Sequence, residues 1–131
     1  MKNVIGIGAG SHSQQLIEIL NSQNEYFVHS LFDIDDKKIG TNILNTEVLK
    51  EDLLITDEHL INDFFLGFAG NSFNYMLRKE MYEKFVNYGL NPINIIADNA
   101  SISSSAKLSF GVTVLKSVII NTNVIVGENT L

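Results

Sequence analysis

Residues 96–131 carry an aliphatic side chain at every sixth position. Cut into six-residue blocks, or hexads, they begin at Ile96, Ile102, Leu108, Val114, Ile120 and Val126, and the fifth position of each hexad is small or β-branched. An α-helix has a period near 3.6 and a strand a period of about 2, so this pattern fits neither. It is typical of a parallel β-helix, in which the first residue of each hexad fills the interior. Ordinary short strands with a coincidental spacing are the alternative.

Ahead of the hexads, apolar strand patterns alternate with helical ones. Three strands are predicted, at residues 2–7, 26–32 and 64–68. The first strand runs into a glycine-rich turn, and the helix predicted at residues 14–21 follows with Ser11 or Ser13 as its cap. Strands that alternate with helices form parallel sheets.

A longer helix is predicted after the third strand, with Phe73, Leu77, Met81 and Phe85 on one apolar face. Its charged residues lie largely off that face: Arg78, Lys79, Glu80, Glu83 and Lys84. Gly89 is expected to terminate the helix. Asn91 and Pro92 then begin the connection, and residues 93–96 are interpreted as a fourth strand or as the lead-in to the hexads.

Residues 41–62 give no clear pattern. We interpret residues 45–51 as a loop or short turn of helix, residues 53–55 as a strand remnant, and residues 57–61 as a short helix. The chain is therefore predicted to be α/β, with a small parallel-sheet domain at residues 1–91 that leads directly into a β-helix segment at residues 92–131.

The composition narrows the class of protein. A chain of 131 residues with 45% hydrophobic residues, 9 Gly and 1 Pro is typical of a folded protein. A net charge of −6 argues against a general nucleic-acid binder. The absence of cysteine excludes disulfides and thiolate metal sites, and we expect no metal. We find neither a signal peptide nor a membrane span in the sequence, so a cytoplasmic location is expected.

Candidate chemistry lies in the loops that follow the predicted strands, because ligands of open parallel sheets bind at the carboxyl ends of the strands. The loop at residues 8–13 contains Gly8 and Gly10, which allow a sharp turn and a close approach to a phosphate at the start of the next helix. It matches Gly-x-Gly-x-x-Gly only in part, since Ser13 occupies the third glycine position. A tight turn without a ligand is the alternative.

Two further loops carry polar candidates. Asp35 and Asp36 follow the second strand, where a carboxylate accepts hydrogen bonds from a ribose or a base, although a solvated turn is the simpler interpretation. His12 is a candidate donor to a phosphate or a sugar hydroxyl. His29 and His59 lie within a predicted strand and a predicted short helix, and we expect them to be structural or solvated.

The order of these motifs resembles one branch of the hexapeptide acyltransferases, the bacterial sugar acetyltransferases of the sialic-acid O-acetyltransferase and bacillosamine N-acetyltransferase type. That branch has a G-A-x-G-H-G loop, then F-x-D-D, then G-N, then hexads. Here the corresponding residues read GAGSHS at 8–13, FDIDD at 32–36 and GN at 70–71. Ser11 and Ser13 depart from the family pattern, which has glycine at both positions.

The resemblance implies a Rossmann-like domain followed by the first two coils of a left-handed parallel β-helix. It implies transfer from acetyl-CoA to a nucleotide sugar or a sialic acid in surface glycan biosynthesis, by a homotrimer. The residues expected to bind the acceptor sugar are Gly8, Gly10, Ser11, His12, Asp35, Asp36, Gly70 and Asn71.

No catalytic residue is expected within this chain. The branch places its general base, a histidine, in the coils shortly after an Ile-Asn-Thr segment, which corresponds to residues 120–122 here. No histidine follows His59. We therefore expect the chain to be a truncated form that lacks the catalytic and acetyl-CoA-binding coils.

Two alternatives remain open. The chain could be an NAD(P)- or nucleotide-binding Rossmann domain, with Asp33 or Asp35 contacting an adenosine ribose. It could also be a non-catalytic assembly protein, in which the short β-helix serves only to form a trimer.

Overall fold

The computed structural model describes residues 1–56, 61–70 and 75–131. Within these residues, six strands form one sheet in the order β3-β4-β2-β1-β5-β6. The strands are β1 (Lys2–Ile7), β2 (Tyr26–Asp33), β3 (Asn42–Ile43), β4 (Thr46–Lys50), β5 (Asp63–Leu66) and β6 (Asn91–Pro92). All neighbouring pairs are parallel except β3 and β4. The predicted α/β class with a largely parallel sheet is confirmed.

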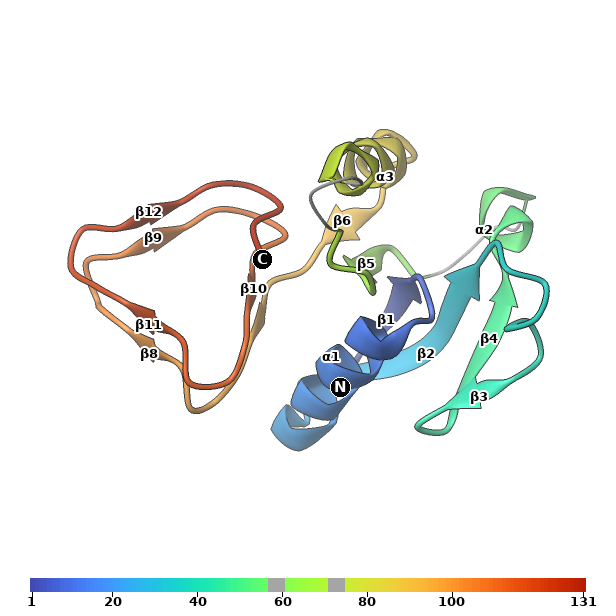
Figure 1. The fold of residues 1–131 in the computed structure, drawn as a ribbon, viewed down its shortest axis with the longest axis horizontal. Helices are drawn as coiled ribbons and strands as arrows, with labels where there is room; N and C mark the ends of the chain where they lie inside the picture. Colours follow the sequence, from blue (N-terminus) through green and yellow to red (C-terminus); the bar gives the residue numbers. More distant parts are fainter. Residues whose placement is uncertain (57–60, 71–74) are drawn as a thin grey trace.

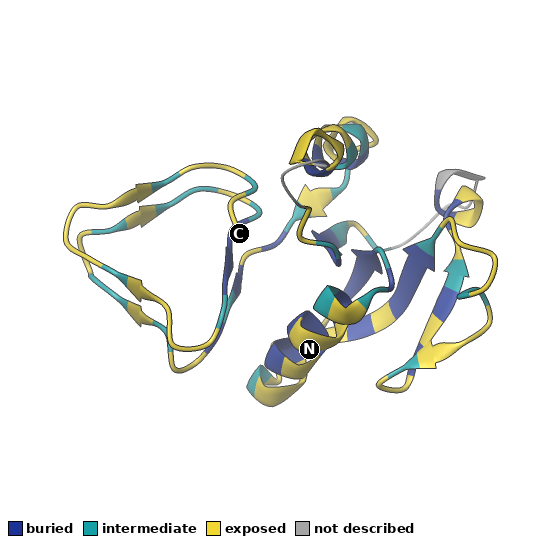
Figure 2. Ribbon diagram, in the orientation of Figure 1, coloured by how far each residue is buried: buried dark blue, intermediate teal, exposed yellow. Residues whose placement is uncertain are grey.

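Helices cover both faces of this sheet. Successive residues of β1 point to opposite sides, so its apolar side chains pack against a different helix on each face. Val4 packs in one buried cluster with Leu16 of α1 (Ser11–Gln23). Ile5 packs in a second buried cluster with Phe85 of α3 (Tyr75–Asn87). Figure 2 shows this core as the dark blue sheet and the inner face of α1.

The start of α1 differs from the expectation. The helix begins at Ser11, earlier than the predicted residue 14, and its N-cap is Gly10 without a side-chain cap hydrogen bond. Ser13 lies inside the helix, where its buried hydroxyl donates to the carbonyl of Gly10. The prediction that Ser11 or Ser13 caps the helix is therefore wrong.

The region after β2 contains a strand where we expected a loop. β4 pairs with β2 and alternates buried Thr46 and Val48 with exposed Glu47. It is joined to β3 by a turn in which Leu44 and Asn45 both have positive φ, as a two-residue hairpin requires. The predicted strand remnant at residues 53–55 lies within α2 (Asp52–Thr56) instead. The short helix predicted at residues 57–61 falls mostly on residues 57–60, which lie outside the described residues.

The buried face of α3 agrees only in part with the predicted one. Phe85 is buried as predicted, whereas Leu77 is 46% exposed. Arg78 and Tyr82, which were not predicted on this face, are buried. Phe73, which the prediction placed on the apolar face, lies outside the described residues. As predicted, Gly89 terminates the helix: its φ is 91°, and the N–H of Leu90 donates back to the carbonyl of Phe85.

The hexads form short strands that recur every six residues. They are β7 (Ile95–Ile96), β8 (Ser101–Ile102), β9 (Lys107–Leu108), β10 (Thr113–Val114), β11 (Ile119–Ile120) and β12 (Ile125–Val126). Each of the first three pairs in parallel with the strand three places later. Figure 1 shows the result as two stacked turns with a three-sided outline, which we call the three-sided coil.

Side chains at the corners of the three-sided coil fix the register of its two turns. Asn94, Asn99 and Ser105 each accept a hydrogen bond from the backbone N–H of the residue 18 positions later. One corner residue in each of the last four hexads has positive φ: Gly111, Ser117, Asn123 and Asn129. Glycine and asparagine adopt this backbone conformation most readily, which accounts for their presence at three of these four corners.

Candidate functional site

A cavity of about 260 Å³ lies where β1, β2, β4 and β5 end. Its walls come from the loops after these strands and from one side of α3. The lining residues are Ile7, Gly8, Ala9, Gly10, Phe32, Asp33, Ile34, Lys38, Glu51, Phe68, Leu77, Met81 and Lys84. This is the edge at which open parallel sheets bind ligands.

The glycine loop runs close to its neighbours and leaves one side open. Gly8 has φ of 97°, a conformation that other residues rarely adopt. The N–H of Gly67 donates to the carbonyl of Ile7 at 2.6 Å, which holds the loop after β5 against the glycine loop. A side chain at Gly10 would meet no atom within 4 Å, so the backbone before α1 is open to a ligand.

Asp33, the last residue of β2, ties the glycine loop to the loop that follows β2. Its Oδ2 accepts a hydrogen bond from the N–H of Ala9 at 2.8 Å, and its Oδ1 accepts one from the N–H of Asp35 at 2.8 Å. Lys38 lies 3.8 Å from the same carboxylate. Asp33 therefore sets the shape of two walls of the cavity.

Asp33→Asn is expected to destabilise the protein by about 1–3 kcal/mol, because an amide offers one oxygen and leaves one backbone N–H without its acceptor. Urea unfolding measures the change. Asp36→Asn makes the same charge change on an exposed side chain of the adjoining loop and is expected to stay within about 0.5 kcal/mol of wild type. Equal stability of the two variants would contradict the tethering role of Asp33.

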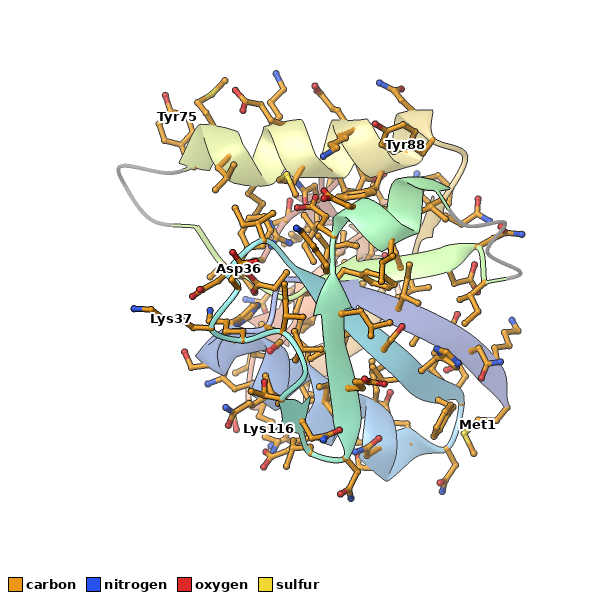
Figure 3. The ribbon with its side chains drawn as sticks, turned by 90° about the vertical axis from the view of Figure 1, so that its right-hand side faces the viewer. Met1, Asp36, Lys37, Tyr75, Tyr88 and Lys116 are labelled. Carbon is orange, nitrogen blue, oxygen red and sulfur yellow. The ribbon has the colours of Figure 1, made fainter. Side chains whose placement is uncertain are left out.

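The residues predicted from the sequence are only partly brought together. Gly8 and Gly10 line the cavity, whereas Ser11, His12, Asp35, Asp36 and Gly70 are not among the described residues that do so. Figure 3 shows Asp36 beside the exposed Lys37 on the loop after β2, and the carboxylate of Asp35 accepts a hydrogen bond from the N–H of Lys37. Asn71 lies outside the described residues. A binding role for these residues stays a prediction.

His12 is half-buried next to the cavity loops. Its Nε2 is shielded from solvent and has no hydrogen-bond partner in the described part of the chain. Burial lowers the pKa of His12 from its ordinary value of 6.5, and the charge of Arg78 lowers it further, while a hydrogen bond with Gln15 opposes both effects. Folding therefore favours the neutral form of this imidazole relative to an exposed histidine.

This lowered pKa predicts a loss of stability in acid. The unfolded chain binds a proton at His12 as the pH falls below 6.5, while the folded chain resists doing so, and folding therefore weakens. In thermal unfolding between about pH 8 and pH 5, His12→Gln should lose less stability toward acid than wild type does. His29→Gln, on an exposed strand position, should follow wild type. A His12→Gln profile that parallels wild type would contradict the prediction.

The cavity contains polar residues that the sequence interpretation missed. Glu51 follows β4, and its side chain is 8% exposed. The ammonium of Lys84 on α3 lies 3.3 Å from its Oε1. The sequence pattern predicts Lys84 off the apolar face of a helix and Glu51 in a loop or short turn of helix. Only the fold shows that the two side chains meet at the cavity. No group of three or more His, Asp or Glu in the described residues could hold a metal ion.

Helix α3 connects the cavity to the three-sided coil through Arg78. The Nη1 of Arg78 donates to the carbonyl of Phe68, a cavity residue, at 2.6 Å. Its Nε donates to the carbonyl of Asn129 in the coil at 3.3 Å, and the amide of Asn129 donates to the carbonyl of Arg78. Burial lowers the pKa of the Arg78 guanidinium. One buried side chain thus bonds both a wall of the cavity and a corner of the coil.

No helix in residues 1–56, 61–70 or 75–131 combines the length and the hydropathy that crossing a membrane requires.

Comparison with known proteins gives consistent matches over nearly the whole chain. GDP-perosamine N-acetyltransferase of Escherichia coli O157:H7 is 28% identical over 130 residues, which cover 96% of this chain and 57% of that protein. The structure of the H141N mutant of perosamine N-acetyltransferase from Caulobacter crescentus, in complex with CoA and GDP-perosamine, matches 98% of this chain with a TM-score of 0.85 and 26% identity. No protein-family model matches the sequence.

A third protein shares the fold. The acetyltransferase domain of PglB from Neisseria gonorrhoeae FA1090 matches 98% of this chain with a TM-score of 0.80 at 20% identity. The chain covers 59% of the Caulobacter protein and 60% of the Neisseria domain. It therefore spans less than two thirds of the length of each of these three proteins.

Proposed function

Because the chain is a relative of bacterial sugar acetyltransferases, we propose that it forms the acceptor-binding part of an acetyl-CoA-dependent sugar N-acetyltransferase. The acceptor is a nucleotide sugar, and the product serves surface glycan biosynthesis in the cytoplasm. The observation that carries the proposal is the cavity beside the glycine loop in a chain that matches, over 98% of its length, a structure bound to CoA and GDP-perosamine.

The cavity supports the nucleotide part of the proposal. The open backbone at Gly10 and the free N–H groups at the start of α1 suit a diphosphate. Apolar side chains beside the loop suit the nucleoside. Ser11, His12, Asp35, Asp36, Gly70 and Asn71 complete the proposed acceptor site.

We assign residues 1–91 to acceptor binding and residues 92–131 to the first two coils of a left-handed parallel β-helix. The six-residue recurrence of the coil strands and their 18-residue register support this assignment. We further propose that the β-helices of three subunits form a homotrimer that holds acetyl-CoA between them.

The proposed reaction joins the amine of the acceptor sugar to the carbonyl carbon of the acetyl thioester, and the thiol of CoA leaves. A base must take a proton from that amine as the bond forms. We assign no such base to this chain. Its part in the reaction is to hold the nucleotide and so to place the amine.

Isothermal titration calorimetry of the 131-residue chain tests the proposal. GDP-sugars and UDP-sugars are expected to bind, and free sialic acid and CMP-sialic acid are expected to bind more weakly. Asp33→Asn serves as the variant with a disturbed cavity and should bind less tightly than Glu47→Gln, which changes an exposed carboxylate of β4 outside the proposed site. Failure of every nucleotide sugar to bind at millimolar concentration would overturn the proposal.

The two alternatives are tested with the same material. The carboxylate of Asp33 at the end of β2 stands where dinucleotide-binding domains hold the ribose, so NADH is included in the titration. Tight binding of NADH without binding of nucleotide sugars would favour that function. A stable trimer in light scattering without affinity for any of these ligands would favour an assembly protein.

A further inference from the structure

The cavity extends along the edge of the sheet from the glycine loop to the carboxylate of Glu51 and the ammonium of Lys84. In the sheet, β4 lies two places from β1, and neighbouring strands are about 4.8 Å apart, so Glu51 lies roughly 10 Å along the edge from the glycine loop. Asp33 lies between them, because the N–H of Glu51 donates to its carbonyl. A nucleotide whose diphosphate occupies the glycine loop would thus reach past Asp33 with its ribose and bring its base to Glu51.

The walls along this path suit a flat ring. Phe68, Leu77 and Met81 line one side of the cavity, and Ile34 lines it from the loop after β2. Ile34 is 76% exposed and Leu77 is 46% exposed, which is unfavourable for large apolar side chains in water. A nucleobase stacked between such side chains would cover them, and stacking of this kind is independent of the identity of the base.

The polar groups at the end of the path are the carboxylate of Glu51 and the ammonium of Lys84. The Glu51 side chain is 8% exposed and the Lys84 side chain 38% exposed, so the pair is partly removed from water. Ion pairs of this kind add little to stability, because desolvation offsets their attraction. After pairing with each other at 3.3 Å, the carboxylate still has lone pairs to accept hydrogen bonds and the ammonium still has two N–H groups to donate.

We propose that Glu51 and Lys84 read the edge of the base and select guanine. The inference rests on the proposed function, in that it assigns the base of the nucleotide sugar. Guanine presents a carbonyl oxygen, a ring N–H and an amino group in a row, so Lys84 donates to the oxygen while Glu51 accepts from both nitrogens. Adenine presents an amino group and a bare ring nitrogen at the first two of these positions. It would therefore place a donor against Lys84 and an acceptor against Glu51.

Binding of GDP, IDP, UDP and ADP to the full chain, measured by calorimetry, tests this assignment. Wild type should bind GDP about 10- to 100-fold more tightly than ADP. IDP, which lacks the amino group of guanine, should fall between them. Glu51→Gln should weaken GDP binding about 10-fold or more and bring the ratio of GDP to ADP affinity close to one. The ratio reports on the edge of the base and is not altered by a uniform loss of folded protein.

Matched variants separate this effect from a change of charge. Glu47→Gln alters an exposed residue of the same strand β4 and should keep the GDP preference. Lys84→Met should reduce the preference, whereas Lys79→Met, on the solvent side of the same helix, should not.

An unchanged GDP-to-ADP ratio in Glu51→Gln would overturn the assignment of Glu51, and UDP binding tighter than GDP would overturn the choice of guanine. In both cases the proposed function would stand, whereas absence of binding by any nucleotide would remove both.

Discussion

Gly67→Ala is expected to destabilise the protein by about 3 kcal/mol and to lower the melting temperature by about 10 °C. A Cβ atom at this position would lie 2.5 Å from the carbonyl oxygen of Gly8 and 2.9 Å from the Cβ of Ser13. Both are parts of the glycine loop and the first turn of α1, which are fixed by the sheet and cannot move away independently. The variant should also lose nucleotide binding, because relief of the clash shifts the loop that forms the cavity.

Gly127→Ala is the matched control for this experiment. An added Cβ there would meet no atom within 4 Å, and the expected change is within about 0.5 kcal/mol. Differential scanning calorimetry of both variants measures the difference. If Gly67→Ala melted together with Gly127→Ala, the close approach of the loops after β1 and β5 would be wrong.

Phe85→Ala is expected to cost about 3–5 kcal/mol of folding free energy. The ring of Phe85 is fully buried, and its centroid lies 6.0 Å from that of Phe64 on β5. Its removal opens a void between α3 and the sheet that these two elements cannot fill without losing their other contacts. Since α3 forms one wall of the cavity, nucleotide affinity should fall as well.

Val86→Ala, one residue further along the same helix, provides the comparison. Val86 is partly exposed, so its truncation should cost less than about 1 kcal/mol. Urea unfolding followed by far-UV circular dichroism gives both values. Similar midpoints for the two variants would place Phe85 outside the core.

The sequence predicts best where its pattern is long and regular. The strands β1 and β2, the termination of α3 at Gly89 and the six-residue spacing of the coil strands all follow from local periodicity and backbone preference. The strand β4 was missed, because it has five residues and only Thr46 and Val48 of them are buried. An alternation this short does not stand out from a polar loop.

The errors in the helices arise from contacts between distant residues. A charged residue such as Arg78 is expected on the solvent side of a helix. Here it is buried, because the carbonyls of Phe68 and Asn129 accept its hydrogen bonds, and Asn129 is separated from it by 51 positions. No local pattern contains that information.

The candidate site was predictable in location but not in composition. Glycines after the first strand and acids after the second indicate which edge of the sheet binds a ligand. Which acids line the cavity depends on where each carboxylate points. Asp33 turns toward the glycine loop, whereas Asp35 and Asp36 remain exposed. Glu51 and Lys84 come from elements far apart in sequence, so their pairing required the fold.

Helix α3 presents two interleaved sets of side chains with the same spacing. Leu77, Met81 and Lys84 line the cavity, and the residues directly after each of them, Arg78, Tyr82 and Phe85, are buried. The side chains that contact a ligand and those that stabilise the fold therefore lie on separate sides of α3. A combinatorial library confined to Leu77, Met81 and Lys84 could change which ligand the cavity binds without unfolding the protein. An insertion of one residue ahead of the helix would instead rotate it by about 100° and exchange the two roles.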